Sequence, residues 1–236
     1  MYKYILLDID DTLLDFSAAE EGALSKTLNH YGIEDTEHTR AVYSRVNVSY
    51  WKRFERKEIT KAQLWADRFS AFGKEIGITI GCEQSVEMNT YYLNALGGFA
   101  IPLPGAEDLC RTLIQRGYRL YAVTNGNTAV QHSRLDALGY KKYFSGLFIS
   151  EEVGFNKPSK EYFDVVFEAI GGSRSDYLIV GDSLTSDIAG GANSGIDTCW
   201  YNPRMHENVN GPIPTYTVRN YAELSALLSE SGGCHD

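Results

Sequence analysis

Carboxylates gather at two places in this sequence, each directly after a short apolar run. Asp8 and Asp10 lie in the stretch "DIDDT", and Asp182 and Asp187 lie in "GDSLTSD". Closely spaced carboxylates repel one another and are costly to bury, so both clusters need a neutralising partner. The first is also compatible with a solvated acidic loop, a calcium loop or the metal motif of a glycosyltransferase, and helix capping alone would account for Asp187.

Two other segments carry groups that could bind an anion. In "VTNG", the hydroxyl of Thr124 and the backbone amides that a turn frees at Asn125 could hold phosphate oxygens without adding charge. In "GFNKPS", Lys157 precedes a proline, which keeps it out of a helix, and its compact ammonium suits a cluster of carboxylates and a phosphate. An ordinary Asn-Gly turn and a solvated surface lysine are the alternatives.

Short apolar runs alternate with helical patterns from about residue 100 onward, which is typical of a parallel sheet covered on both faces. The first apolar run must join the same sheet, because a lone buried strand cannot satisfy its backbone groups. Ligands bind at the carboxyl ends of strands in such sheets, so the polar segments can converge on one site. We expect strands at residues 4–7, 119–123, 147–149, 177–180 and 198–201, with helices between them starting near Gly105, Thr128, Lys160 and Ser186.

The stretch between the first strand and residue 100 has the spacing of amphipathic helices and few strand signals. Ser17 with Glu20, and Thr60 with Gln63, have the spacing of a capping box, and Thr36 can cap another helix. This stretch is therefore a helical insertion. We expect a discontinuous α/β core of residues 1–15 and 100–229, an inserted all-helical domain of residues 16–99, and a disordered tail of residues 230–236.

Composition limits the classes of protein. The chain has 236 residues, of which 43% are hydrophobic, enough for a sizeable core, and no run approaches the roughly 18 apolar residues that span a bilayer. A formal net charge of -9 argues against a nucleic-acid polymer or an anionic membrane as partner. The first apolar run is too short for a signal peptide, and the four cysteines lack metal-ligand spacing, so we expect a cytoplasmic protein with reduced thiols.

Together, the order and spacing of the four polar segments resemble the haloacid dehalogenase superfamily of phosphatases. Its four motifs correspond to "DIDDT", "VTNG", Lys157 in "NKPS" and "GDSLTSD". The likeness covers essentially the whole α/β core and implies a Rossmann-like core with three layers. The helical insertion resembles the C1-type cap domain of that superfamily.

The resemblance implies covalent phosphoryl transfer. Asp8 would attack phosphorus and become an aspartyl-phosphate, which is reasonable chemistry where a cation screens its repulsion from the phosphate dianion. Asp10 would protonate the leaving alcohol and then activate water, a role worth about 10²- to 10⁴-fold in rate.

The resemblance also implies a cofactor and a phosphate site. Mg²⁺ would be held by Asp8, the backbone carbonyl of Asp10 and Asp182, with Asp187 in direct or indirect support. The transferring phosphoryl group would be bound by Thr124, the amide of Asn125 and Lys157.

Other activities stay open at this point. A dehalogenase would use the same aspartate on carbon, but the resemblance separates the two, because that branch lacks the second aspartate of "DIDDT" and needs no metal. A phosphomutase uses the same constellation and differs mainly in keeping water out. A non-catalytic phosphate-sensing module is the alternative from another class, although receiver domains are shorter and lack such an insertion.

The substrate is indicated by two longer stretches. "DIDDTLLDF" and "EITKAQLWADRF" resemble the branch of 5'-nucleotidases that act on pyrimidine and non-canonical nucleoside monophosphates, and Asp11 fits that branch. We therefore expect a 5'-nucleotidase, with phosphoglycolate or a sugar phosphate as alternative substrates. The expected partner is a small phosphorylated metabolite, and the expected assembly is a monomer or a weak homodimer.

Overall fold

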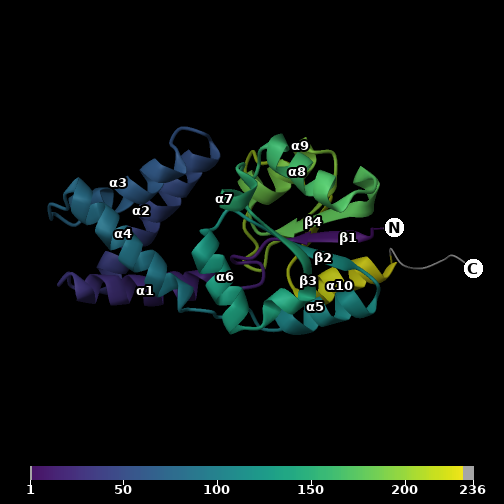
Figure 1. Cartoon of the computed structure of the whole chain (residues 1–236), viewed down its shortest axis with the longest axis horizontal. Coiled ribbons are helices and arrows are strands. Elements are labelled where there is room, and N and C mark those ends of the chain that lie inside the picture. Colours follow the sequence, from purple (N-terminus) through teal and green to yellow (C-terminus); the bar gives the residue numbers. More distant parts are fainter. Residues whose placement is uncertain (1, 231–236) are drawn as a thin grey trace, which may run out of the picture. The chain divides into compact units, whose positions relative to one another are not determined.

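The computed structural model describes residues 2–230 and divides into two compact units (Figure 1). One unit combines the residues up to Phe16 with those from Ala100 onward, and the other is Ser17–Phe99. The last helix ends at Glu230, the first residue of the predicted tail, and the rest of that tail lies outside the described residues. No helix in the described part of the chain is long and apolar enough to span a bilayer.

The α/β unit is built on a parallel sheet. Over residues 2–230 it has six strands in the order β3-β2-β1-β4-β5-β6, and every neighbouring pair is parallel. The strands are β1 (Tyr4–Leu7), β2 (Arg119–Thr124), β3 (Phe144–Ile149), β4 (Tyr177–Gly181), β5 (Asp197–Tyr201) and β6 (Tyr216–Val218). The predicted fold class is confirmed. The edge strand β6 was not predicted, since its three residues form no apolar run.

Helices follow the strands in the alternation that the sequence predicted. They are α5 (Ala106–Gln115), α6 (Thr128–Ala137), α7 (Ser150–Val153), α8 (Lys160–Ile170), α9 (Ala189–Asn193) and α10 (Tyr221–Glu230). Short helical turns lie at η1 (Tyr140–Tyr143), η2 (Arg174–Asp176) and η3 (Leu184–Ile188), the last being a π-type turn.

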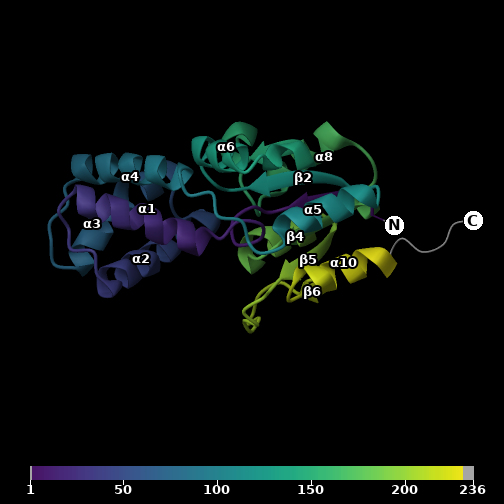
Figure 2. The same cartoon turned by 90° about the horizontal axis from the view of Figure 1, so that it is seen from below.

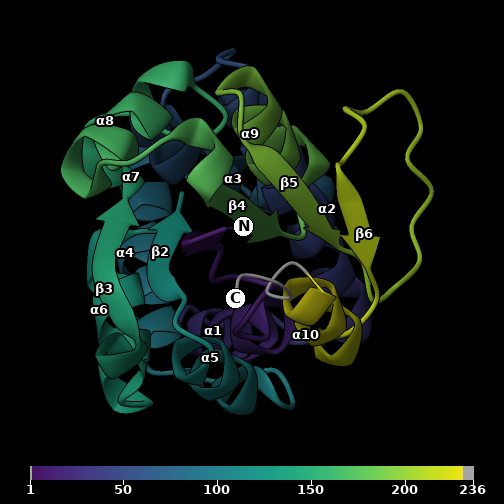
Figure 3. The same cartoon turned by 90° about the vertical axis from the view of Figure 1, so that its right-hand side faces the viewer.

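The sheet is covered on both faces because successive side chains of its strands point to opposite sides. Ile5 and Leu7 of β1 pack in a cluster with Leu224 of α10, whereas Leu6 packs with Phe163 of α8. Figure 3 shows α5 and α10 on one face and α8 and α9 on the other. Each such aliphatic side chain contributes about 1.5–3 kcal/mol when fully buried, so this core fixes where the strand ends lie.

In the helical unit, helices that follow one another along the chain run in opposite directions (Figure 2). They are α1 (Phe16–His30), α2 (Glu37–Glu55), α3 (Lys61–Glu75) and α4 (Cys82–Gly97). The predicted caps at Thr36 and Thr60 are confirmed, and Thr60 forms its capping box with Gln63.

The predicted capping box of Ser17 and Glu20 is wrong. The helix α1 starts at Phe16, two residues earlier than a cap at Ser17 requires, and the Phe16 backbone N–H donates to the Asp11 carboxylate at 3.1 Å. Ser17 therefore lies inside the helix. Glu20 points into the helical unit instead, where its carboxylate accepts a hydrogen bond of 2.6 Å from the side chain of Asn47.

Candidate active site

The carboxyl end of β1 places Asp8 against a buried lysine. The backbone N–H of Asp8 donates to the carbonyl of Val180 at 3.0 Å, which extends the pairing with β4 by one residue. The Lys157 Nζ lies 2.6 Å from Oδ1 of Asp8, 2.6 Å from Oδ1 of Asp187 and 2.8 Å from the carbonyl oxygen of Val123. An ammonium has three N–H donors, so these contacts use all of them and fix Lys157 between the two acids.

The loop that carries Lys157 is held by the segment after β2. The Asn125 side chain donates to the Lys157 carbonyl at 2.8 Å and accepts from the Lys157 backbone N–H at 2.9 Å. Thr124 is buried, and its hydroxyl accepts from the Gly126 backbone N–H at 3.0 Å. The end of β2 and the loop between α7 and α8, 32 residues apart along the chain at Asn125 and Lys157, therefore form one local structure, in which Asn125 positions the lysine loop.

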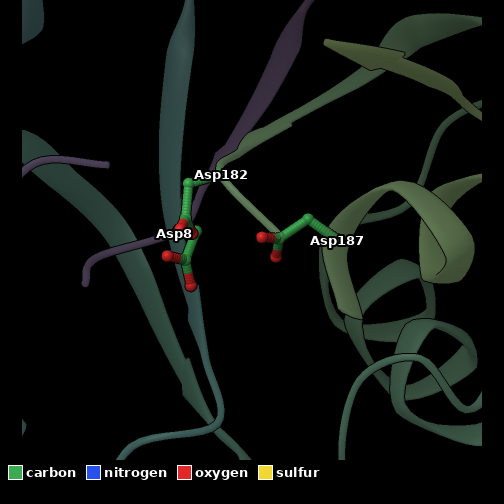
Figure 4. Close-up of side chains that lie close together, drawn as sticks. All are labelled: Asp8, Asp182 and Asp187. Carbon is green, nitrogen blue, oxygen red and sulfur yellow. The ribbon is translucent and has the colours of Figure 1, made fainter. Parts of the chain in front are cut away.

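Three carboxylates meet beside Lys157. Asp8, Asp182 and Asp187 each offer an oxygen, and these oxygens all lie within 4.8 Å of one another. Figure 4 shows the carboxylates of Asp8 and Asp182 close together and that of Asp187 directed toward them. Such a set of oxygen ligands fits a hard divalent cation such as Mg²⁺.

Hydrogen bonds connect the two acidic loops to each other and to β5. The backbone N–H of Asp182 donates to the Thr12 hydroxyl at 3.1 Å, and the indole of Trp200 donates to the Asp182 carbonyl at 2.8 Å. The π-type turn η3 brings the Asp187 carboxylate back over its own start, where Oδ2 accepts from the Ser183 N–H at 3.2 Å. Rare π-type turns often occur at functional sites.

The electrostatics of the cluster also fit a bound cation. Burial raises the pKa of Asp8 to about 8 although Lys157 opposes the shift, and burial followed by the charges of Asp8 and Asp187 raises the pKa of Asp182 well above its usual range. Burial works against the Lys157 ammonium, but Asp187 and Asp8 outweigh it and raise the lysine pKa. The cluster thus has three carboxylates and one ammonium, which contacts Asp8 and Asp187. A divalent cation would favour the ionised forms of all three acids.

Asp10 lies outside this group of three. Its carboxylate accepts hydrogen bonds from Arg134 at 2.5 Å and from Gln131 at 2.6 Å, both on α6. Gln131 and Arg134 were not predicted from the four motifs. Their signal was an arginine and a glutamine, three residues apart, among the buried positions of a helix that also buries Val130 and Leu135.

Comparison with known proteins places the chain in a family. Residues 2–195 match the family model described as "Hydrolase: haloacid dehalogenase-like hydrolase". The chain is 41% identical to the pyrimidine 5'-nucleotidase PynA of Streptococcus pneumoniae, over 98% of this chain and 96% of the relative. It is 36% identical to the pyrimidine 5'-nucleotidase YjjG of Escherichia coli, over 96% and 98%.

A solved structure agrees with this placement. The HAD-hydrolase YfnB of Bacillus subtilis, crystallised with magnesium, is 41% identical and superimposes with a TM-score of 0.90 over 96% of this chain and 98% of that one. The chain therefore belongs to the haloacid dehalogenase-like hydrolases and is an enzyme of that family. The resemblance predicted from the four motifs is confirmed.

Proposed function

We propose that this protein is a Mg²⁺-dependent phosphomonoester hydrolase that works through an aspartyl-phosphate on Asp8 and acts on pyrimidine nucleoside 5'-monophosphates. The observation that carries the proposal is the placement of Asp8 at a strand end, 2.6 Å from a buried lysine and within a cluster of three carboxylates. A carboxylate can attack a phosphate dianion only where positive charge screens their repulsion.

The residues present fit magnesium. The carboxylates of Asp8, Asp182 and Asp187 supply oxygen ligands, and the backbone carbonyl of Asp10 is the further ligand expected from the motif. Mg²⁺ commonly takes one or two carboxylates and substrate phosphate, together with several waters. When bound, it would neutralise charge that develops on the transferring phosphoryl group.

The reaction follows from the roles of the chain's own side chains. The Asp8 carboxylate forms a bond to phosphorus, the bond from phosphorus to the ester oxygen breaks, and Asp10 gives that oxygen a proton. Asp10 then takes a proton from water, whose oxygen bonds to phosphorus as the bond to Asp8 breaks and inorganic phosphate leaves. Thr124 and the backbone amide of Asn125 would bind the phosphoryl oxygens in both steps, and Lys157 would join them by exchanging one of its three present contacts for a phosphoryl oxygen.

The substrate class rests on the relatives. PynA and YjjG carry the name of pyrimidine 5'-nucleotidases and align with nearly the whole chain, the helical unit Ser17–Phe99 included. In this proposal the helical unit acts as the cap that selects the nucleoside. Three acids favour phosphoryl transfer over dehalogenation, namely Asp10, the second aspartate of "DIDDT", and Asp182 and Asp187 of "GDSLTSD".

A panel of phosphomonoesters tests the proposal. UMP, dUMP and dTMP would be compared with AMP, phosphoglycolate, a sugar phosphate and p-nitrophenyl phosphate, with Mg²⁺ and with EDTA. The expected result is phosphate release that requires the metal and is fastest from the pyrimidine nucleotides. A preference for a non-nucleotide ester would overturn the substrate class, and the absence of turnover with any ester would overturn the phosphatase assignment.

A further inference from the structure

Two buried side chains of α6 hold both oxygens of the Asp10 carboxylate. Arg134 Nη1 lies 2.5 Å from Oδ1, and Gln131 Nε2 lies 2.6 Å from Oδ2. The exposed fraction is 0% for Arg134 and 1% for Gln131, whereas the Asp10 side chain is 26% exposed. The carboxylate is thus fixed from its buried side and stays accessible on the other.

The segment after β2 shapes the position of Gln131. The Asn127 side chain caps α6 by accepting from the Val130 backbone N–H at 3.2 Å. A Cβ on Gly126 would lie 2.2 Å from Gln131 Nε2, so only glycine leaves room for the amide. The same amide nitrogen donates to the Thr124 hydroxyl at 3.1 Å, which joins the Asp10 contact to the strand end expected to bind phosphate.

A carboxylate that transfers protons gains from being held in one orientation. Misplacement of a reacting group lowers the rate steeply, and two hydrogen bonds to two different oxygens fix a carboxylate better than one. Arg134 suits this position because its planar guanidinium keeps its charge and its donors point in fixed directions.

We infer that Gln131 and Arg134 are positioning residues, which set the place of the Asp10 carboxylate for proton transfer to the leaving group. The inference rests on the proposed phosphomonoesterase activity and adds to it two residues outside the four motifs. It predicts a dependence on the leaving group. An alcohol needs a proton as it departs, whereas p-nitrophenolate is stable enough to leave without one.

The test compares kcat/KM for p-nitrophenyl phosphate with kcat/KM for the alkyl phosphate that the wild type hydrolyses best in the panel above. These values report the steps through departure of the leaving group. In Arg134→Met the value for the alkyl ester should fall at least about tenfold more than the value for p-nitrophenyl phosphate. Arg134→Lys, which keeps the positive charge, should recover part of the alkyl-ester kcat/KM that Arg134→Met loses.

Two further variants keep the test decisive. Gln131→Met should show the same selective loss, smaller in size, and it serves if Arg134→Met does not fold. Val130→Ala is a buried change on the same helix at a side chain that cannot hydrogen-bond to Asp10, and it should lower both values equally or not at all. Equal losses for the two esters in an active protein would overturn the inference alone, whereas a wild type without phosphatase activity would overturn the proposed function and the inference with it.

Discussion

Lys157 is the residue that makes the crowded acids of this site possible. Burying an ammonium is costly unless hydrogen bonds and opposite charges compensate it. Here two carboxylates and a backbone carbonyl accept hydrogen bonds from its three N–H groups, and the side chain is 1% exposed. Its charge therefore offsets part of the repulsion between Asp8 and Asp187, and a bound cation would offset the rest.

The first prediction at this scale concerns the nucleophile. Asp8→Asn should lower turnover at least about 10³-fold, because an amide cannot attack phosphorus as a carboxylate does. Steady-state phosphate release with Mg²⁺ measures the effect, and a retained cooperative thermal transition shows that the fold is intact. Asp15→Asn, in the same loop, is the control and should keep its activity. Turnover near the wild-type level in Asp8→Asn would remove Asp8 as the nucleophile.

The second prediction concerns the metal. Asp182→Asn should raise the Mg²⁺ concentration needed for half-maximal activity by about tenfold or more, because a neutral amide is a weaker ligand and supplies no charge. A magnesium titration of activity measures it. Asp136→Asn, an exposed acid paired with Lys141 on the surface, is the matched control. An unchanged titration in Asp182→Asn would place this residue outside the metal site.

At the scale of elements, the end of β4 and the turn η3 that follows it form one close-packed structure. A Cβ on Gly181 would lie 2.2 Å from both Cγ and Oδ2 of Asp187. The strand end and the acid can therefore approach only because position 181 has no side chain. The same close approach lets the Asp187 carboxylate accept a hydrogen bond from Lys157 at 2.6 Å.

This packing gives a third prediction. Gly181→Ala should lower kcat/KM at least about tenfold by displacing Asp187, and should destabilise the fold by about 1–3 kcal/mol, the usual range for overpacking. Activity and urea unfolding measure the two effects. Gly81→Ala is the matched control, because a Cβ there meets no neighbour within 4 Å. If the two alanine variants behave alike, the strand end does not position Asp187.

At the scale of the whole molecule, each unit has its own interior, and the helical unit is built around a buried arginine. Arg68 is 1% exposed and donates to Asn89 at 2.9 Å and to Asn47 at 3.0 Å. Its guanidinium lies 4.8 Å from the centre of the Trp65 ring and 4.6 Å from that of Tyr92. These contacts connect α2, α3 and α4.

The fourth prediction follows from this network. Arg68→Ala should destabilise the helical unit by about 3–5 kcal/mol, because it leaves a cavity and takes the donors from two buried amides. Urea unfolding followed by the fluorescence of Trp51 and Trp65 measures it. Arg45→Ala, which breaks an exposed ion pair with Glu75, should cost under about 1 kcal/mol. Equal effects in the two variants would show that the buried network adds no stability.

The local pattern of the sequence determined the fold class and the set of candidate residues. A strand, its polar end and the helix after it are encoded within about 15 neighbouring residues, and parallel sheets place such ends along one edge. This is why Asp8, Thr124 and Asp182 could be proposed together from the printed sequence. The edge strand β6 and the start of α1 were not predicted. The three residues of β6 form no apolar run, and the hydrogen bond from the Phe16 N–H to the Asp11 carboxylate is not visible in a pattern of residue types.

Only the tertiary structure decided which atoms meet. Lys157 contacts Asp8 across 149 residues of chain, and Arg134 contacts Asp10 across 124. Such pairings depend on the register of the strands and on how deeply each side chain is buried, and periodicity along the chain carries neither. The sequence therefore determined that acids, a lysine and a hydroxyl gather at one sheet edge. The packing of α6 and η3 decided that Asp187 joins Asp8 at Lys157 while Asp10 turns to Gln131 and Arg134, because close contacts between distant segments fix the side-chain orientations.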